Sequence, residues 1–99
     1  MADAAIRVGD AGWVLSGELD FDTVPALLQH RGVQMEAGHD LTIDLSEVTR
    51  VDSAGLALMI EWLRESERKG LNMTFTHVPE QLLSIARVCG LEDILFQKH

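Results

Sequence analysis

Apolar residues along the chain recur with two spacings, one typical of strands and the other typical of helices. Alternation over short runs predicts strands at residues 6–8, 13–17, 41–45 and 73–76. Spacings of three and four residues predict helices at residues 23–38, 53–69 and 79–90, and residues 94–96 fit either a short strand or a turn of helix. Because strands alternate with helices after an N-terminal hairpin, we expect an α/β fold. This fold would consist of a mixed, mostly parallel sheet of four or five strands and three main helices that pack on the sheet.

The predicted helices begin and end at residues with suitable capping chemistry. Thr23 can cap the first helix, where Pro25 occupies the first turn and lacks an N–H that would otherwise be unbonded. Gly70 and Gly90 are placed to end the second and third helices. Cys89 falls on the apolar face of the third helix, so we expect it to be a small buried residue.

The central helix, residues 53–69, carries apolar side chains on two faces. The expected core face consists of Leu56, Met59, Ile60 and Leu63. A second stripe, bordered by acidic and basic residues, consists of Ala54, Leu58 and Trp62, with Glu61, Glu65 and Lys69 at its margin. A helix that covers one side of a sheet needs only one apolar face. We therefore expect the second stripe to meet either a neighbouring helix of the same domain or another protein, since Trp is enriched at interfaces.

Asp52, Ser53 and Gly55 stand at the start of the central helix. Ser53 is suited to cap that helix, which would stabilise it by about 1 kcal/mol. The helix start also presents free N–H groups and a partial positive charge, so a partner contact or a phosphate at Ser53 is a second hypothesis. A phosphate would place about two negative charges beside Asp52, and we expect it to break a contact rather than create one.

Composition and charge narrow the classes of function. The chain has 99 residues, enough for one domain, 1–99, with one core. Its net charge of −8 disfavours nucleic acid and anionic lipid as direct partners and favours a basic protein surface. The longest apolar run, 54–60, is much shorter than the roughly 20 residues of a membrane-spanning helix. The lone cysteine, Cys89, suits a reducing cytoplasm.

Enzyme and metal-site hypotheses find little support in the sequence. The four histidines lack the spacing of metal ligands, and no nucleophile elbow, phosphate-binding loop or dinucleotide fingerprint is present. A response-regulator receiver would gather acidic residues around Mg²⁺, and the candidates for such a cluster are Glu18, Asp20, Asp22, Asp44 and Asp52. A receiver also needs a Lys after a late strand, where this chain has His77 and Pro79. We therefore expect no catalysis, no cofactor and no metal.

Three motifs follow one another along the chain: GELD at 17–20 followed by Thr23, LTIDLS at 41–46 and VDSAGL at 51–56. In this order they resemble the motifs of the STAS domain family, which includes anti-sigma-factor antagonists and the cytoplasmic tails of sulfate transporters. The resemblance runs from residue 13 to residue 95 and implies the STAS fold with a non-enzymatic role in protein binding. Ser53 stands where antagonist relatives carry a phosphorylated serine, whereas Ala54 replaces the second Ser or Thr of many antagonists.

Within the family, residues 44–58 are similar to the stand-alone STAS subunit of a bacterial phospholipid-transport ABC complex. That similarity implies a cytoplasmic subunit of a Gram-negative bacterium, held at the inner face of the inner membrane by the ATPase MlaF. The complex also has permease and periplasmic lipid-binding subunits and maintains outer-membrane lipid asymmetry. The alternative is an anti-sigma-factor antagonist regulated by phosphorylation of Ser53. The predicted partner-binding residues are Asp20, Asp52, Ser53, Ala54, Leu58, Glu61, Trp62 and Glu65.

Overall fold

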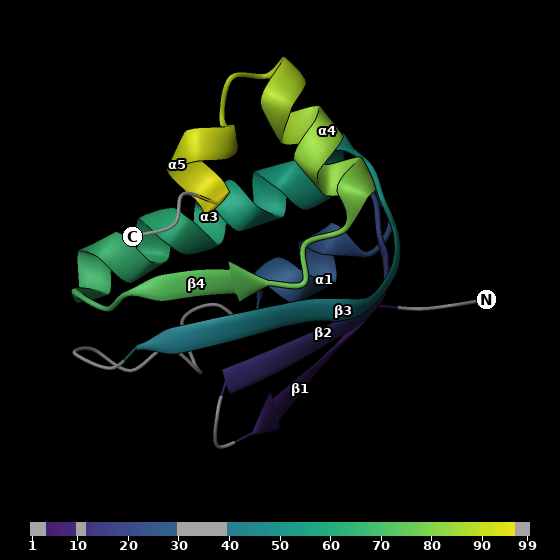
Figure 1. Cartoon of the computed structure of the whole chain (residues 1–99). Coiled ribbons are helices and arrows are strands. Elements are labelled where there is room, and N and C mark those ends of the chain that lie inside the picture. Colours follow the sequence, from purple (N-terminus) through teal and green to yellow (C-terminus); the bar gives the residue numbers. More distant parts are fainter. Residues whose placement is uncertain (1–3, 10–11, 30–39, 97–99) are drawn as a thin grey trace.

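The structure is a computed structural model that describes residues 4–9, 12–29 and 40–96. Its elements follow one another as a hairpin and then alternating helices and strands (Figure 1). The strands are β1 (Ala5–Gly9), β2 (Gly12–Leu19), β3 (Leu41–Val51) and β4 (Met73–Thr76). The helices are α1 (Val24–Leu28), α3 (Ser53–Lys69), α4 (Glu80–Val88) and α5 (Glu92–Phe96). Within these described ranges, no helix is long and apolar enough to cross a membrane.

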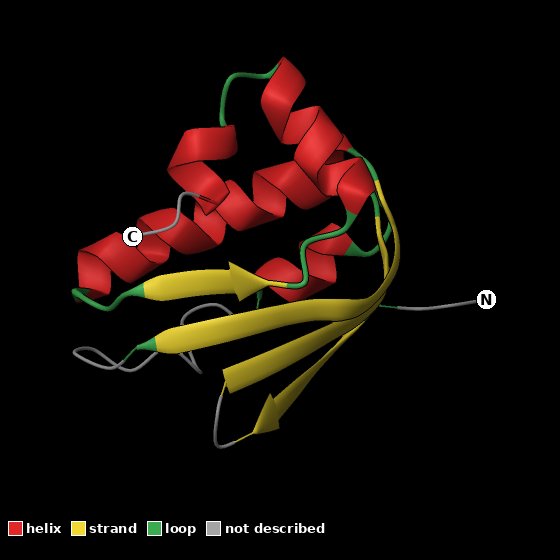
Figure 2. Cartoon of the chain, viewed as in Figure 1, coloured by secondary structure: helices red, strands yellow, loops and turns green. Residues whose placement is uncertain are grey.

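The strands form one sheet in the order β1-β2-β3-β4. β1 and β2 are antiparallel, whereas β2, β3 and β4 run parallel to one another. The helices gather on one face of this sheet (Figure 2). The predicted α/β fold with a mixed, mostly parallel sheet is therefore confirmed.

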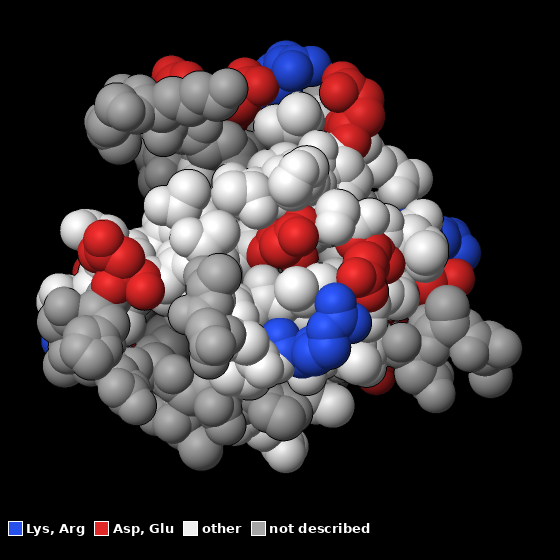
Figure 3. Space-filling model, turned by 60° about the horizontal axis from the view of Figure 1, so that its bottom comes forward, with Lys and Arg blue, Asp and Glu red and all other residues white. Residues whose placement is uncertain are grey.

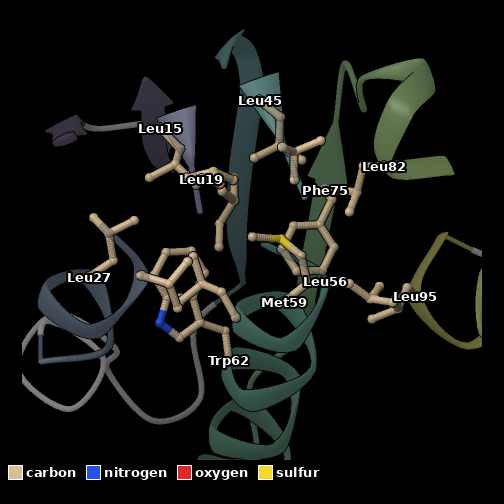
Figure 4. Close-up of a cluster of buried hydrophobic side chains, with 14 of the residues drawn as sticks. Leu15, Leu19, Leu27, Leu45, Leu56, Met59, Trp62, Phe75, Leu82 and Leu95 are labelled. Atoms are coloured by element: carbon tan, nitrogen blue, oxygen red, sulfur yellow. The ribbon is translucent and has the colours of Figure 1, made fainter. Parts of the chain in front are cut away.

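The core lies between the sheet and the helices (Figure 4). In β2, the buried side chains of Trp13, Leu15 and Leu19 alternate with half-buried residues on the opposite face. This two-residue period is that of a strand with one covered face. Helix α3 ends at Gly70, whose φ of 68° lies in the left-handed region that favours glycine. Burial of the apolar side chains is the main contribution that holds these layers together.

β3 is longer than predicted, because it continues past Leu45 to Val51 as an extended strand. Its second half pairs with the end of β2, where Glu18 lies opposite Arg50 and Leu19 lies opposite Val51. Two shifts of register along this pair accommodate the extra residues. The pairing joins segments that are distant in sequence, so the local apolar pattern after Leu45 does not reveal it.

The remaining helices differ from the predictions near their ends. α1 ends at Leu28, and residues 30–38 of the predicted first helix lie outside the described residues. Residues 94–96 belong to α5, so the last element is a helix. The predicted burial of Cys89 is wrong, because this residue is exposed and forms the C-cap of α4. The chain turns there into Gly90, with a φ of 73°, and leaves the apolar face of the helix.

Candidate functional site

The carboxyl ends of β2 and β3 meet beside the start of α3 (Figure 1). Leu19 pairs with Val51 where the strands end, and the N–H of Asp52 donates to the Leu19 carbonyl at 3.1 Å. The loop after β2 and the start of α3 therefore leave the sheet side by side, at the kind of edge where open parallel sheets carry functional sites. The exposed and half-buried residues of this edge, here called the Ser53 surface, are Asp20, Phe21, Asp22, Asp52, Ser53 and Ala57.

Asp52, and not Ser53, caps helix α3. The Asp52 carboxylate accepts a hydrogen bond from the backbone N–H of Ala54 at 2.8 Å, and the Asp52 backbone is extended, with a φ of −119°. Ser53 is the first helical residue and is exposed. Its hydroxyl has no hydrogen-bond partner within the part of the chain that the structure describes. The capping hypothesis for Ser53 is therefore wrong, and its hydroxyl is available to another molecule.

We expect Asp52→Ala to lower the free energy of unfolding by about 1 kcal/mol, because the substitution leaves the N–H of Ala54 without its partner. Asp52→Asn keeps an accepting oxygen and should cost clearly less. Urea denaturation followed by circular dichroism measures both variants. Equal stability of Asp52→Ala and the unsubstituted chain would mean that water replaces this cap without cost.

Gly55 lets the start of α3 lie directly on the strand ends. It is buried, and a Cβ atom built on it would collide with Cγ2 of Val51 and lie 3.2 Å from Cβ of Leu19. A larger residue would push α3 away from β2 and β3. The glycine therefore sets how closely Ser53 approaches the end of the sheet.

The loop that follows β2 is braced by its own hydrogen bonds. The Asp20 carboxylate accepts from the N–H of Asp22 at 2.9 Å and from the N–H of Thr23 at 3.1 Å. The Thr23 hydroxyl donates to the Glu18 carbonyl at 2.7 Å and accepts from the N–H of Asp20 at 3.0 Å. The predicted role of Thr23 as side-chain cap of α1 is therefore wrong, because its hydroxyl braces the loop. Within this loop, Phe21 is 73% exposed.

The second apolar stripe of α3 lies inside the domain. Ala54 is buried, and Leu58 and Trp62 are fully buried. Trp62 projects toward the side of α1 that carries Leu27 (Figure 4), and its ring meets that of Trp13 edge to face with centroids 5.4 Å apart. Of the two alternatives for this stripe, the structure therefore bears out the neighbouring helix of the same domain, since α1 covers the stripe together with Trp13 of β2. The predicted part of these three residues in partner binding is wrong, because their side chains are buried.

Glu61 and Glu65 lie farther along α3 and pair within the helix. Glu61 is 3.7 Å from Arg64, and Glu65 forms an ion pair with Arg68 that raises the pKa of the Arg68 guanidinium. The Glu61–Arg64 pair lies at the surface, and surface ion pairs contribute little to stability. The predicted partner-binding residues that the structure does bring together at one exposed edge are Asp20, Asp52 and Ser53.

The acidic residues do not assemble as a receiver would require. Asp44 pairs with Thr76 within the sheet, away from the strand ends at which Asp52 lies. The N–H of Ser46 donates to the Asp44 carboxylate at 2.8 Å and lowers the pKa of that carboxyl, as does His77 at 3.1 Å. Among the described residues, no group of three or more His, Cys, Asp or Glu could hold a metal ion.

Residues 7–97 match a family model described as "Mlab, STAS domain", a span that contains the end of β1, strands β2, β3 and β4, and the Ser53 surface. The chain belongs to the STAS domain family. Two curated STAS relatives are named intermembrane phospholipid transport system binding protein MlaB. The Haemophilus influenzae protein is 37% identical over 80% of this chain and 79% of its own length. The Escherichia coli protein is 38% identical over 91% of each chain.

A solved STAS structure shows the same fold. It is an anti-sigma factor antagonist from Mycobacterium paratuberculosis, which superimposes with a TM-score of 0.66 at 27% identity. The superposition covers 97% of this chain and 83% of that one. The predicted STAS fold and the predicted similarity to a phospholipid-transport STAS subunit are both confirmed.

Proposed function

We propose that this chain is a non-enzymatic STAS subunit of an ABC phospholipid transporter that maintains outer-membrane lipid asymmetry. It binds the ATPase of that transporter, an MlaF-like protein, and supports its assembly and activity. Through this partner it is held at the cytoplasmic face of the inner membrane, in a complex with permease and periplasmic lipid-binding subunits. The names of the MlaB relatives, which refer to intermembrane phospholipid transport, support this assignment.

The exposed hydroxyl of Ser53, which has no hydrogen-bond partner among the described residues, is the observation that favours docking at this edge. Because Asp52 caps α3, the Ser53 side chain is not needed for helix stability and is exposed. The hydrogen bond from Asp52 to Leu19 and the close packing of Gly55 hold its backbone in place. A group that is already fixed loses little conformational entropy when a partner binds it. We therefore place the ATPase contact on the Ser53 surface.

The charge of the chain favours a basic surface on the ATPase. Asp20, Asp22 and Asp52 all belong to the Ser53 surface, and the whole chain carries a net charge of −8. On the face shown in Figure 3, acidic side chains are widely spread and basic ones are few. Complementary charge raises the rate of association and orients the partners before contact.

We expect Ser53→Arg to weaken binding to the purified ATPase subunit about tenfold, because it adds bulk at the contact and a positive charge opposite basic groups. Isothermal titration calorimetry measures the dissociation constant. Ser53→Thr keeps the hydroxyl and should bind nearly as well as the unsubstituted chain. Ser84→Arg makes the same change at an exposed position of α4 and is the matched control. If both arginine variants bind equally well, the contact lies elsewhere.

The second candidate is an anti-sigma-factor antagonist switched by phosphorylation of Ser53. The solved antagonist with this fold and the exposed serine at a helix start favour it. It requires phosphate on Ser53 in cells and binding to a kinase-like anti-sigma factor that Ser53→Glu abolishes. Mass spectrometry of the protein purified from its host, together with its genomic neighbours, separates the two candidates. Genes for an ABC permease and a periplasmic lipid-binding protein favour the first.

A further inference from the structure

Phe21 is an aromatic residue of the Ser53 surface whose side chain is exposed to solvent. Its side chain is 73% exposed, although an aromatic residue is among those that gain most from burial. The other large apolar side chains exposed on the described chain are Val8 and Val88. Val8 lies on the edge strand β1, and Val88 ends α4, which runs away from the Ser53 surface (Figure 1).

Hydrogen bonds in the loop around Phe21 hold its backbone where the side chain is exposed. Both flanking acidic residues are tied down, since the Asp20 carboxylate accepts from the N–H of Asp22 and the Asp20 N–H donates to Thr23. The N–H of Val24 also donates to the Asp20 carbonyl at 3.0 Å, which joins the loop to the start of α1. The backbone that carries Phe21 is therefore fixed before any partner arrives, so binding costs little backbone entropy at this position. Aromatic side chains at such positions are typical centres of binding energy.

The surroundings of Phe21 indicate which chemistry would receive it. Asp20 and Asp22 flank it in the chain, and Asp52 and Ser53 follow the strand that pairs with β2 beside it. A pocket that accepts the ring must therefore be apolar inside and basic at its border. Anionic lipid fits poorly, because three carboxylates would approach the membrane together with the ring.

We propose that Phe21 is the apolar anchor of the Ser53 surface and inserts into a pocket of the ATPase that basic side chains border. This inference rests on the proposed function, and it adds the residue that supplies most of the apolar contact. Ser53 then lies at the margin of the same contact, where its hydroxyl forms a polar interaction. The acidic residues orient the approach, and the ring determines how long the complex lasts.

Titration of the full-length variants against the purified ATPase subunit tests the anchor. Phe21→Ser is expected to raise the dissociation constant about tenfold or more, mainly through faster dissociation. Phe21→Leu keeps an apolar side chain and should retain most of the affinity. Val88→Ser removes a comparably exposed apolar side chain away from this surface and should bind like the unsubstituted chain. Because both positions are exposed, the thermal unfolding midpoints of all variants should match that of the unsubstituted chain.

The outcomes separate this inference from the function on which it rests. If the ATPase binds the chain and Ser53→Arg weakens binding while Phe21→Ser does not, the anchor is overturned and the proposed function stands. If the unsubstituted chain does not bind the ATPase, both are overturned. Sedimentation with phosphatidylglycerol vesicles is expected to show no binding. Binding to these vesicles that Phe21→Ser abolishes would overturn the anchor in favour of a lipid contact.

Discussion

Replacing Trp62 by alanine is expected to lower the free energy of unfolding by about 3–5 kcal/mol. The Trp62 side chain is fully buried and packs edge to face on Trp13, with Leu27 of α1 nearby (Figure 4). Alanine would leave a cavity between α3, α1 and β2 that these elements cannot close. Domains of this size have only about 5–15 kcal/mol of stability in total. Urea denaturation measures the loss, and any weaker binding by this variant would follow from unfolding rather than from a missing contact.

Trp62→Phe is the matched variant and is expected to cost much less than Trp62→Ala. The indole N–H of Trp62 is buried and finds no hydrogen-bond partner among the described residues. A buried donor without a partner costs about 1–3 kcal/mol, and phenylalanine removes that donor while it keeps most of the apolar volume. If Trp62→Phe were as unstable as Trp62→Ala, the indole N–H would have to be satisfied in solution, and it would then stabilise the fold.

The apolar pattern of α3 shows which residues share a face but not what covers each face. The sequence correctly groups Leu58 with Trp62, yet both are fully buried instead of forming a docking stripe. On the predicted core face Met59 is fully buried, whereas Ile60 and Leu63 are only half-buried. The buried stripe of α3 is covered by α1 and by Trp13 of β2. Both elements come earlier in the sequence, and the tertiary fold brings them against α3. Local spacing carries no information about that arrangement.

The sequence predicts where the candidate site lies better than it predicts the role of each residue in that site. The sequence places Asp52 and Ser53 at the start of the central helix, which the structure bears out, but it does not show that the preceding strand runs on to Val51. Asp52 caps α3, whereas Ser53 is exposed at its first position. This division of roles depends on dihedral angles and hydrogen-bond geometry that a sequence does not contain. The exposure of Phe21 could have been predicted from the sequence, because an aromatic residue between Asp20 and Asp22 in a loop has no apolar face of a strand or helix to join.

Gly55→Ala is expected to lower the free energy of unfolding by about 1–3 kcal/mol through overpacking. The new Cβ would collide with Cγ2 of Val51 and crowd Cβ of Leu19 at 3.2 Å. Val51 is buried and β-branched, so its methyl group cannot swing aside. Alanine is intrinsically better in a helix than glycine by about 1 kcal/mol, which works in the opposite direction. The clash should exceed this gain, and chemical denaturation gives the net effect.

A double-mutant cycle with Val51→Ala identifies the clash as the cause. Val51→Ala alone destabilises by opening a cavity, but it removes the methyl group that the new Cβ of Gly55→Ala would meet. In that background Gly55→Ala should cost little, so the double variant should lose about 1–2 kcal/mol less free energy of unfolding than the sum of the two single variants.

The same cycle can be measured in binding. Because the start of α3 carries Ser53, the single Gly55→Ala variant should also bind the ATPase more weakly, and Val51→Ala should restore part of that affinity. Strictly additive effects would mean that α3 has room to move over the ends of β2 and β3, and the position of Ser53 would then be set by its partner rather than by the fold.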